Sequence, residues 1–306
     1  MKISKNIQQL LLLIFVLFTS SKLVAQTNQK LYNGLTDLDS KSASFFKANN
    51  INVVTTVDSR YFAPNPNGNI DFNLFAKSLN IWFPNSASKG IAALDWEGGS
   101  LQALHNSPNT NSFKNALNQY IQLIKFAKKM RPNVKWGYYS IPFTTYWGRD
   151  SKWQQLNQNI LPLLKECDIL FPSLYVFYQQ GSEDKAGNIS YAQDNMMECL
   201  KLGVMINKPV LPYVWNRYHN SNKKIGLELI PINDFTAYIK AILNTSYLDE
   251  KAAGIVWWGA DKYFYRVKSK ALTNEFTHSN NKNFNDYDDY LTVEYGTQIL
   301  KAINGK

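Results

Sequence analysis

The chain has 306 residues, of which 45% are hydrophobic and 18% are charged, with 15 Gly and 11 Pro. This composition is typical of a globular protein and excludes collagen-like, intrinsically disordered and coiled-coil chains. The formal net charge of +10 favours an anionic partner such as an acidic polysaccharide or a cell surface, although many basic proteins bind nothing acidic.

The N-terminus has the pattern of a secretory signal peptide. Lys2 and Lys5 precede nine consecutive apolar residues, 10–18, and a short stretch ending at Ala25 follows them. Nine apolar residues are too few to span a bilayer, so we expect cleavage after Ala25 and export of residues 26–306 as a single domain, periplasmic or extracellular. An exported protein is a poor candidate for nucleic-acid binding, and we expect no stable membrane insertion.

Residues 26–306 alternate between apolar runs and segments with helical periodicity. The runs are rich in β-branched and aromatic residues and predict strands at 51–57, 90–96, 135–140, 169–176, 209–215 and 254–259. Helical periodicity predicts helices at 112–130, 151–166, 191–202, 233–243 and 287–303. The first of these helices has Ser112 as a candidate N-cap, and Pro132 lies just beyond its end.

Repeated alternation of strands and helices predicts a parallel sheet with helices outside it. The predicted strands are apolar along their whole length, as burial on both faces requires. We therefore expect a single-domain α/β fold, a distorted (β/α) TIM-like barrel of seven or eight strands. An open doubly wound sheet is the alternative, although no Gly-rich nucleotide-binding loop follows any predicted strand.

Two acidic residues, Asp95 and Glu97, end the predicted strand at 90–96. Strand side chains alternate, so both face the same side, with Cα atoms roughly 6–7 Å apart. Two such carboxyls do not ionise independently, so one keeps its proton to higher pH and can act as a general acid beside a charged group. Glycosidic bond cleavage needs this arrangement. The alternative is that both residues are solvated at a strand end.

The placement of the two acids also bears on mechanism. A conventional retaining glycosidase has its acid and its nucleophile on opposite sides of the scissile bond. Two acids side by side on one strand favour instead a substrate-assisted reaction, in which the N-acetyl oxygen of the sugar attacks the anomeric carbon.

Aromatic residues lie at the ends of three other predicted strands: Tyr175 at the end of one, Tyr213 to Tyr218 at the end of another, and Trp258 at the end of the last. Aromatic rings stack on the apolar faces of sugars, and Tyr hydroxyls can hydrogen-bond an acetamido group. In a barrel the carboxyl ends of all strands meet on one face. The pattern predicts a sugar-binding site beside the paired acids.

Cys167 and Cys199 are the only cysteines, and the sequence leaves open whether they form a disulfide or are two buried thiols. His105, His219 and His278 are far apart along the chain, and no Cys/His cluster has the spacing of a zinc site. We expect neither a metal nor a cofactor. The oligomeric state stays open.

Several segments, taken in order, resemble the hyaluronidases of glycoside hydrolase family 56. Residues 93–97 resemble the Asp-Trp-Glu catalytic strand of that family, and the further matching segments are residues 131–139, 170–175, 209–214 with Tyr218, and 253–259. The resemblance spans roughly residues 70 to 260. It implies a distorted (β/α) barrel and an endo-β-N-acetylhexosaminidase that cleaves hyaluronan, and often chondroitin, with retention and without metal.

The same resemblance implies roles for individual residues. Glu97 would be the general acid/base, and Asp95 would orient the acetamido group and stabilise it as it becomes an oxazolinium. Tyr175 and Tyr218 would contact the reacting sugar, and Trp258 would pack against its acetamido methyl group.

The predicted substrate-binding residues also include Tyr139 and Tyr213. A basic cleft would attract the carboxylates of an acidic polysaccharide such as hyaluronan or chondroitin. Arg60, Arg149 and Arg217 lie near predicted strand ends and are candidates for that cleft.

One departure from the family pattern lies next to the paired acids, where Gly98-Gly99-Ser100 stands in place of a continuation that contains Trp-Arg-Pro. This leaves open another N-acetylhexosamine-containing glycan as the substrate. A non-catalytic glycan-binding barrel that retains the acids by descent is the alternative from a different functional class.

Overall fold

The computed structural model describes residues 29–65, 68–182 and 187–305, so the predicted signal peptide lies outside the described residues. Six strands form one parallel sheet in the order β4-β3-β2-β1-β8-β5. Their bounds are β1 Lys30–Leu35, β2 Asn52–Asp58, β3 Gly90–Asp95, β4 Val134–Tyr138, β5 Tyr213–Val214 and β8 Gly254–Gly259.

The segment at 170–173 joins the two edges of this sheet. It makes isolated parallel bridges to the end of β4, through Tyr139 and Phe171, and to the β5 side, through Leu170 with Val210 and Ser173 with Tyr213. The strands therefore close into a ring rather than an open doubly wound sheet, and the predicted distorted barrel is confirmed. Six of its members are regular strands, and the seventh pairs only through isolated bridges.

Gly137 permits the close approach that completes the ring. A Cβ atom at this position would lie 2.2 Å from the Ile169 carbonyl oxygen and 2.7 Å from the Phe171 ring. Real Cβ atoms do not approach a backbone oxygen so closely, so only glycine lets β4 pack this tightly on the seventh segment.

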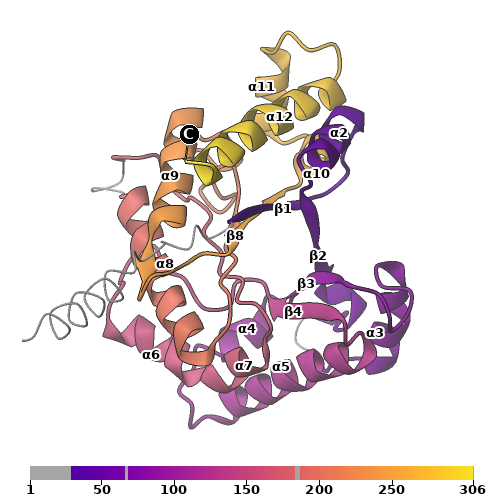
Figure 1. Ribbon diagram of the computed structural model, residues 1–306, viewed down its shortest axis with the longest axis vertical. Helices are drawn as coiled ribbons and strands as arrows, with labels where there is room; N and C mark the ends of the chain where they lie inside the picture. Colours follow the sequence, from indigo (N-terminus) through magenta and orange to yellow (C-terminus); the bar gives the residue numbers. More distant parts are fainter. Residues whose placement is uncertain (1–28, 66–67, 183–186, 306) are drawn as a thin grey trace, which may run out of the picture.

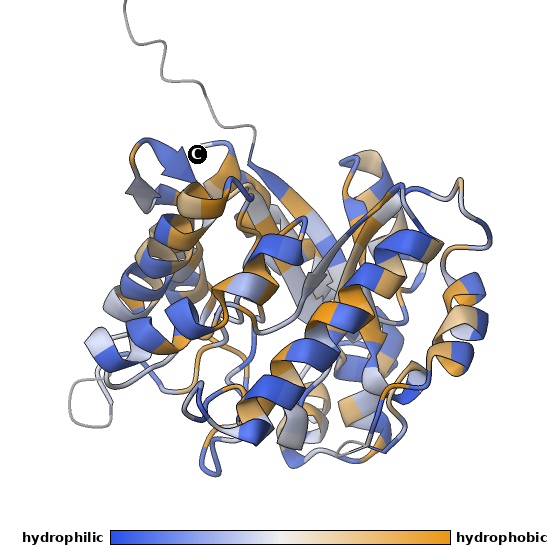
Figure 2. Ribbon diagram, turned by 90° about the horizontal axis from the view of Figure 1, so that it is seen from below, coloured by the Kyte–Doolittle hydropathy of each residue, from blue (hydrophilic) through white to orange (hydrophobic). Residues whose placement is uncertain are grey.

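Helices surround the strands (Figure 1), and hydrophobic and hydrophilic residues occur on the same helices, as amphipathic packing requires (Figure 2). Their bounds are α2 Ser40–Ala48, α3 Phe72–Ser78, α4 Gly99–Ala103, α5 Asn111–Met130, α6 Ser151–Asn159, α7 Leu161–Glu166, α8 Asn188–Ile206, α9 Ile232–Asn244, α10 Asp261–Arg266, α11 Lys270–Thr277 and α12 Phe284–Ile303. Two 3-10 turns, Ser59–Tyr61 and Leu79–Ile81, and a hairpin of β6 Ser246–Tyr247 and β7 Glu250–Lys251 complete the described elements.

Two local predictions need correction. The N-cap of α5 is Thr110, whose hydroxyl accepts a hydrogen bond from the Phe113 amide, and Ser112 lies inside the helix. The helix predicted at 151–166 is two helices that meet at Ile160, because Pro162 lacks an amide hydrogen and fits the first turn of α7 better than the interior of a longer helix.

The apolar core has two parts. The larger cluster lies between the strands and the helices, and the smaller one fills the inside of the ring. The inner cluster takes alternate residues from successive strands: Val54, Ala93, Ile169, Phe171, Tyr175, Leu211, Tyr213, Trp215 and Val256. This alternation follows from the period of two along a strand and decides which residues reach the open end of the ring.

Cys167 and Cys199 are both buried and unpaired. Across the described part of the chain, each helix is too short or too polar to cross a bilayer.

We expect Gly137→Ala to destabilise the fold by about 1–3 kcal/mol, because the added methyl group meets the Ile169 backbone oxygen, which cannot move aside, as well as the Phe171 ring. Gly90→Ala in β3 is the matched control, since its Cβ would meet only the edge of the Phe83 ring at 3.0 Å. Denaturant unfolding of both variants measures the difference. Equal losses would contradict the role given to Gly137.

Candidate active site

A cavity of about 170 Å³ opens at the carboxyl ends of the strands. Catalytic sites of (β/α) barrels occupy this face. The cavity is lined by Thr56, Asp95, Glu97, Tyr139, Tyr175, Tyr213, Trp215, His219, Asn220, Trp258 and Phe264. It therefore combines two carboxyls with a wall of aromatic rings.

The end of β3 delivers both carboxyls to this cavity. Ala93 belongs to the inner cluster and Trp96 to the outer one, so Asp95 and Glu97 share the inner side of the ring with Ala93. The backbone between the acids is held from α5, where the Tyr120 hydroxyl donates a hydrogen bond of 2.5 Å to the Trp96 carbonyl. The two rings also stack with centroids 4.7 Å apart.

The electrostatics of the pair favour a retained proton. Burial, with smaller contributions from Glu97 and Asp58, raises the pKa of Asp95 to about 7. The Asp95 Oδ1 atom is buried and has no hydrogen-bond partner within the described residues. Glu97 is more exposed, and partial desolvation followed by the charge of Asp58 raises its pKa.

Asp58 completes a group of three carboxyls at neighbouring strand ends, since β2 and β3 pair with Asp58 opposite Asp95. The Asp58 carboxylate accepts a hydrogen bond from the Arg60 amide and pairs with its guanidinium at 3.2 Å. Arg60, one of the expected cleft cations, is therefore the partner of this third acid, and both side chains are largely exposed.

Three tyrosines and a tryptophan form the wall that faces the acids. The Tyr139 hydroxyl lies 3.2 Å from Ser173 Oγ, and the Tyr213 hydroxyl lies 3.0 Å from Thr56 Oγ1. Burial raises the pKa of both hydroxyls above the ordinary range, so they stay protonated and can donate hydrogen bonds.

Trp258 lies nearly parallel to the Tyr175 ring, with centroids 5.7 Å apart and an interplanar angle of 29°. Trp215, which the sequence interpretation did not single out, packs edge-on against Trp258 with centroids 4.9 Å apart. Because Trp215 follows Tyr213 by two residues, the period of a strand could have placed it on the same inner face.

The structure brings together six of the seven predicted site residues, and Tyr218 is the exception. Its side chain is 3% exposed, packs in the outer apolar cluster, and does not line the cavity. The neighbouring His219 lines the cavity instead, stacked on Tyr175 with centroids 6.0 Å apart.

Arg217 and Arg149 are engaged in ion pairs. The Arg217 side chain is fully buried and pairs with Asp261 at 2.7 Å and with Glu275 at 2.8 Å, which ties the chain after β5 to α10 and α11. Arg149 pairs with Asp194 of α8 at 2.9 Å. Arg217 therefore supports the fold behind the site rather than contacting a ligand.

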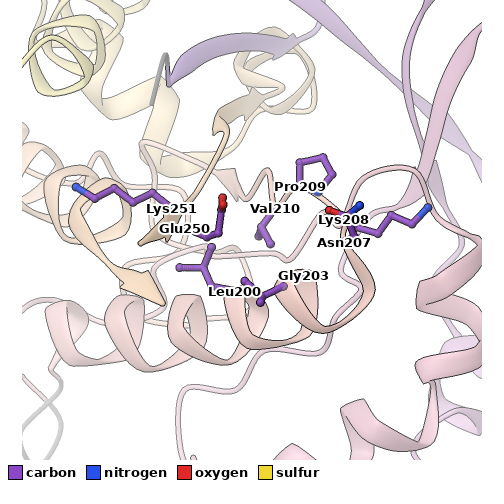
Figure 3. Close-up of a pocket in the computed structure, with 9 residues that line it drawn as sticks. Leu200, Gly203, Asn207, Lys208, Pro209, Val210, Glu250 and Lys251 are labelled. Atoms are coloured by element: carbon purple, nitrogen blue, oxygen red, sulfur yellow. The ribbon is translucent and has the colours of Figure 1, made fainter. Parts of the chain in front are cut away.

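A second cavity lies at the amino ends of the strands, between the end of α8 and the β6–β7 hairpin (Figure 3). Its lining contains Lys208, Glu250 and Lys251 but none of the residues named for the candidate active site. Among the described residues, no group of His, Cys, Asp and Glu side chains could hold a metal ion.

Comparison with known proteins gives a consistent result. A crystal structure of bee venom hyaluronidase in complex with a hyaluronic acid tetramer is similar in fold, with a TM-score of 0.58, 18% sequence identity, and coverage of 84% of this chain and 98% of the bee chain. The chain is also similar to a hyaluronidase of Tabanus yao, at 25% identity over 233 residues, or 63% of each protein. A hyaluronidase of Apis mellifera is 24% identical over 191 residues, or 60% of this chain and 44% of the relative.

The matches to the Tabanus and Apis proteins thus span less than two thirds of the length of those relatives. The family model for hyaluronidases matches residues 100–287, which begin just after Glu97. That match covers more than half of the 306 residues, and the chain belongs to the hyaluronidase family, glycoside hydrolase family 56.

Proposed function

We propose that this protein is an exported endo-β-N-acetylhexosaminidase that hydrolyses hyaluronan, with chondroitin as a second substrate. The main support for this proposal is the pair of carboxyls, Asp95 and Glu97, at the end of β3. Both line an aromatic cavity, and burial there raises the pKa of each. The hyaluronidases among its relatives, and the hyaluronic acid bound to the bee enzyme, support the choice of substrate.

The placement of the acids supports a substrate-assisted reaction that retains the anomeric configuration. Glu97 donates its proton to the glycosidic oxygen while the bond from that oxygen to the anomeric carbon breaks. The acetamido oxygen of the same sugar forms the new bond to that carbon, which gives an oxazolinium ring. Asp95 accepts a hydrogen bond from the acetamido N–H and stabilises the positive charge. Glu97 then takes a proton from water as the water opens the ring.

The two acids exchange the proton as substrate binds. In the free protein the more buried Asp95 holds the proton more strongly. The hydrogen bond from an acetamido N–H is stronger to an ionised carboxylate than to a protonated carboxyl group, so it favours the charged form of Asp95. Because the two sites are coupled, binding shifts the proton toward Glu97, where the leaving oxygen needs it.

The aromatic wall supplies the sugar contacts. Trp258 and Tyr175 offer nearly parallel faces for the apolar side of the ring and its acetamido methyl group. The Tyr139 and Tyr213 hydroxyls line the same cavity as donors. The positive net charge of the chain favours a polymer that carries glucuronate carboxylates.

Another N-acetylhexosamine-containing glycan is the second candidate substrate. It is favoured by Gly98 and Gly99, which follow Glu97 directly and leave that edge of the site without bulky side chains. Digestion of hyaluronan, chondroitin and a neutral N-acetylhexosamine polymer by purified residues 26–306 distinguishes the two candidates.

We expect Glu97→Gln to lower kcat on hyaluronan by about 10²- to 10⁴-fold, because the amide cannot protonate the leaving oxygen. Binding of the glycan should survive, and isothermal titration calorimetry measures it. Glu250→Gln at the opposite end of the barrel is the matched control and should keep wild-type kcat. A Glu97→Gln variant that cleaves as fast as wild type would refute the assigned role.

The pH profile follows from the shared proton. Since the pKa of Asp95 is about 7 in the free protein, the pair loses its last proton as the pH rises through that value. We expect kcat/KM to fall about tenfold per pH unit above about pH 7. Initial rates across the range test this, and a profile that stays flat to about pH 9 would contradict it.

Stability should change with pH in the same region. The raised pKa means that the folded protein binds a proton that the unfolded chain releases, so the contribution of Asp95 is most favourable below the unfolded pKa and is lost as the pH rises through about 7. We expect Asp95→Asn to stabilise the protein at pH 8 by on the order of 2–4 kcal/mol, with little effect at pH 4. Denaturant unfolding at both pH values checks this, and an equal effect at both would count against a buried, protonated Asp95.

A further inference from the structure

A row of aromatic side chains leads out of the candidate active site. It starts at Tyr175, continues to His219 at 6.0 Å between ring centroids, and reaches Phe177 after a further 4.8 Å. Tyr178 follows at 6.4 Å from Phe177, and Trp147 at 5.7 Å from Tyr178. Each ring is within contact distance of the next, and Tyr175 and His219 line the cavity, so the row connects the cavity with Trp147.

Trp147, at the far end of this row, is unusually exposed. Its exposed fraction is 51%, whereas every other tryptophan in the described residues is buried or half-buried. An exposed tryptophan that continues the aromatic lining of a site indicates a ligand contact more strongly than a scattered surface residue does.

The loop that carries Trp147 is fastened to α8. The Thr145 backbone exchanges hydrogen bonds of 2.9 Å with the Asn195 side chain, and the Tyr146 hydroxyl donates to Asn188 Oδ1 at 2.8 Å. The Thr145 hydroxyl in turn donates to the Trp147 carbonyl at 2.5 Å. The tryptophan backbone is thus fixed before any ligand arrives, which reduces the entropy lost on binding.

The row lies on the same face as the acids. Trp147 is in the segment after β4, and Tyr178 is in the segment after the 170–173 bridges, so both follow the carboxyl ends of barrel strands. A polymer that places one sugar between the acids and Trp258 can therefore continue along this face.

A positively charged side chain lies near this row of aromatic rings. Lys223 is exposed in the segment after β5. That segment is tied to the row by Asn222, whose side-chain amide donates a 2.7 Å hydrogen bond to the Phe177 carbonyl. A lysine beside aromatic rings can pair with a carboxylate of a polysaccharide whose sugar rings also present apolar faces to those aromatic rings.

We propose that Trp147, with Tyr178 beside it, forms a distal sugar-binding subsite that stacks on a ring of the acidic polysaccharide several residues from the scissile bond. The inference rests on the proposed function for the class of polymer. Lys223 meets a carboxylate of the same stretch of chain.

The test compares ligands of two lengths. Hyaluronan tetrasaccharide and dodecasaccharide are titrated by calorimetry into Glu97→Gln protein with and without Trp147→Ala. We expect Trp147→Ala to weaken dodecasaccharide binding roughly 5- to 20-fold and to leave tetrasaccharide binding unchanged, because only the longer chain spans both sites. Trp147→Phe keeps a ring and should lose less.

Tyr290→Ala is the matched control, because Tyr290 is similarly exposed, at 53%, on α12. It should bind both ligands like the parent protein. Equal dodecasaccharide affinity with and without Trp147, or a loss of the same size for both ligands, would overturn the subsite.

Hydrolysis of hyaluronan by the wild-type protein is scored in parallel. Cleavage combined with unchanged dodecasaccharide binding in Trp147→Ala would reject the subsite and keep the proposed function. Absence of both cleavage and hyaluronan binding would reject both.

Discussion

The contact between β4 and the segment at 169–171 converts a curved parallel sheet into a closed ring. Gly137 makes this contact possible, since a side chain there would strike the Ile169 carbonyl oxygen. Closure brings Tyr139, at the end of β4, against Tyr175 and Tyr213, with ring centroids 6.0 and 5.1 Å away. The aromatic wall opposite the acids thus depends on a backbone contact beneath it rather than on the wall residues alone.

A second consequence of closure is electrostatic. The inner face of β3 lies within the closed ring, so Asp95, the last residue of this strand, is largely desolvated, while β2 holds Asp58 alongside. A carboxyl in this position destabilises the folded protein at neutral pH, because it must either give up solvation or keep a proton. Other contacts stabilise the fold around this carboxyl: Tyr120 holds the backbone at Trp96, and buried Arg217 joins α10 and α11 to the chain after β5. The buried carboxyl of the candidate active site therefore lowers the stability of the folded protein, and the contacts of Tyr120 and Arg217 raise it.

Much of this arrangement could be predicted from the sequence, for identifiable reasons. The period of two along a strand placed Asp95 and Glu97 on one side, and the fully apolar strands indicated a buried parallel sheet. The alternation of side chains predicts nothing for residues that lie beyond the end of a strand. After Trp215 the chain leaves the regular pattern, so sequence spacing gave no means of predicting that Tyr218 turns into the outer core while His219 faces the cavity. The row leading to Trp147 likewise joins three separate loops, whose contacts are set by tertiary packing.

The central claim is that the paired acids cleave a glycosidic bond by hydrolysis with retention. The most direct test is to digest hyaluronan with purified residues 26–306 and to follow the first products by NMR and mass spectrometry. We expect saturated, even-numbered oligosaccharides whose new reducing ends appear first as the β-anomer. Unsaturated products would indicate a lyase, and initial α-anomers would indicate inversion, and either result would contradict the mechanism assigned to Asp95 and Glu97.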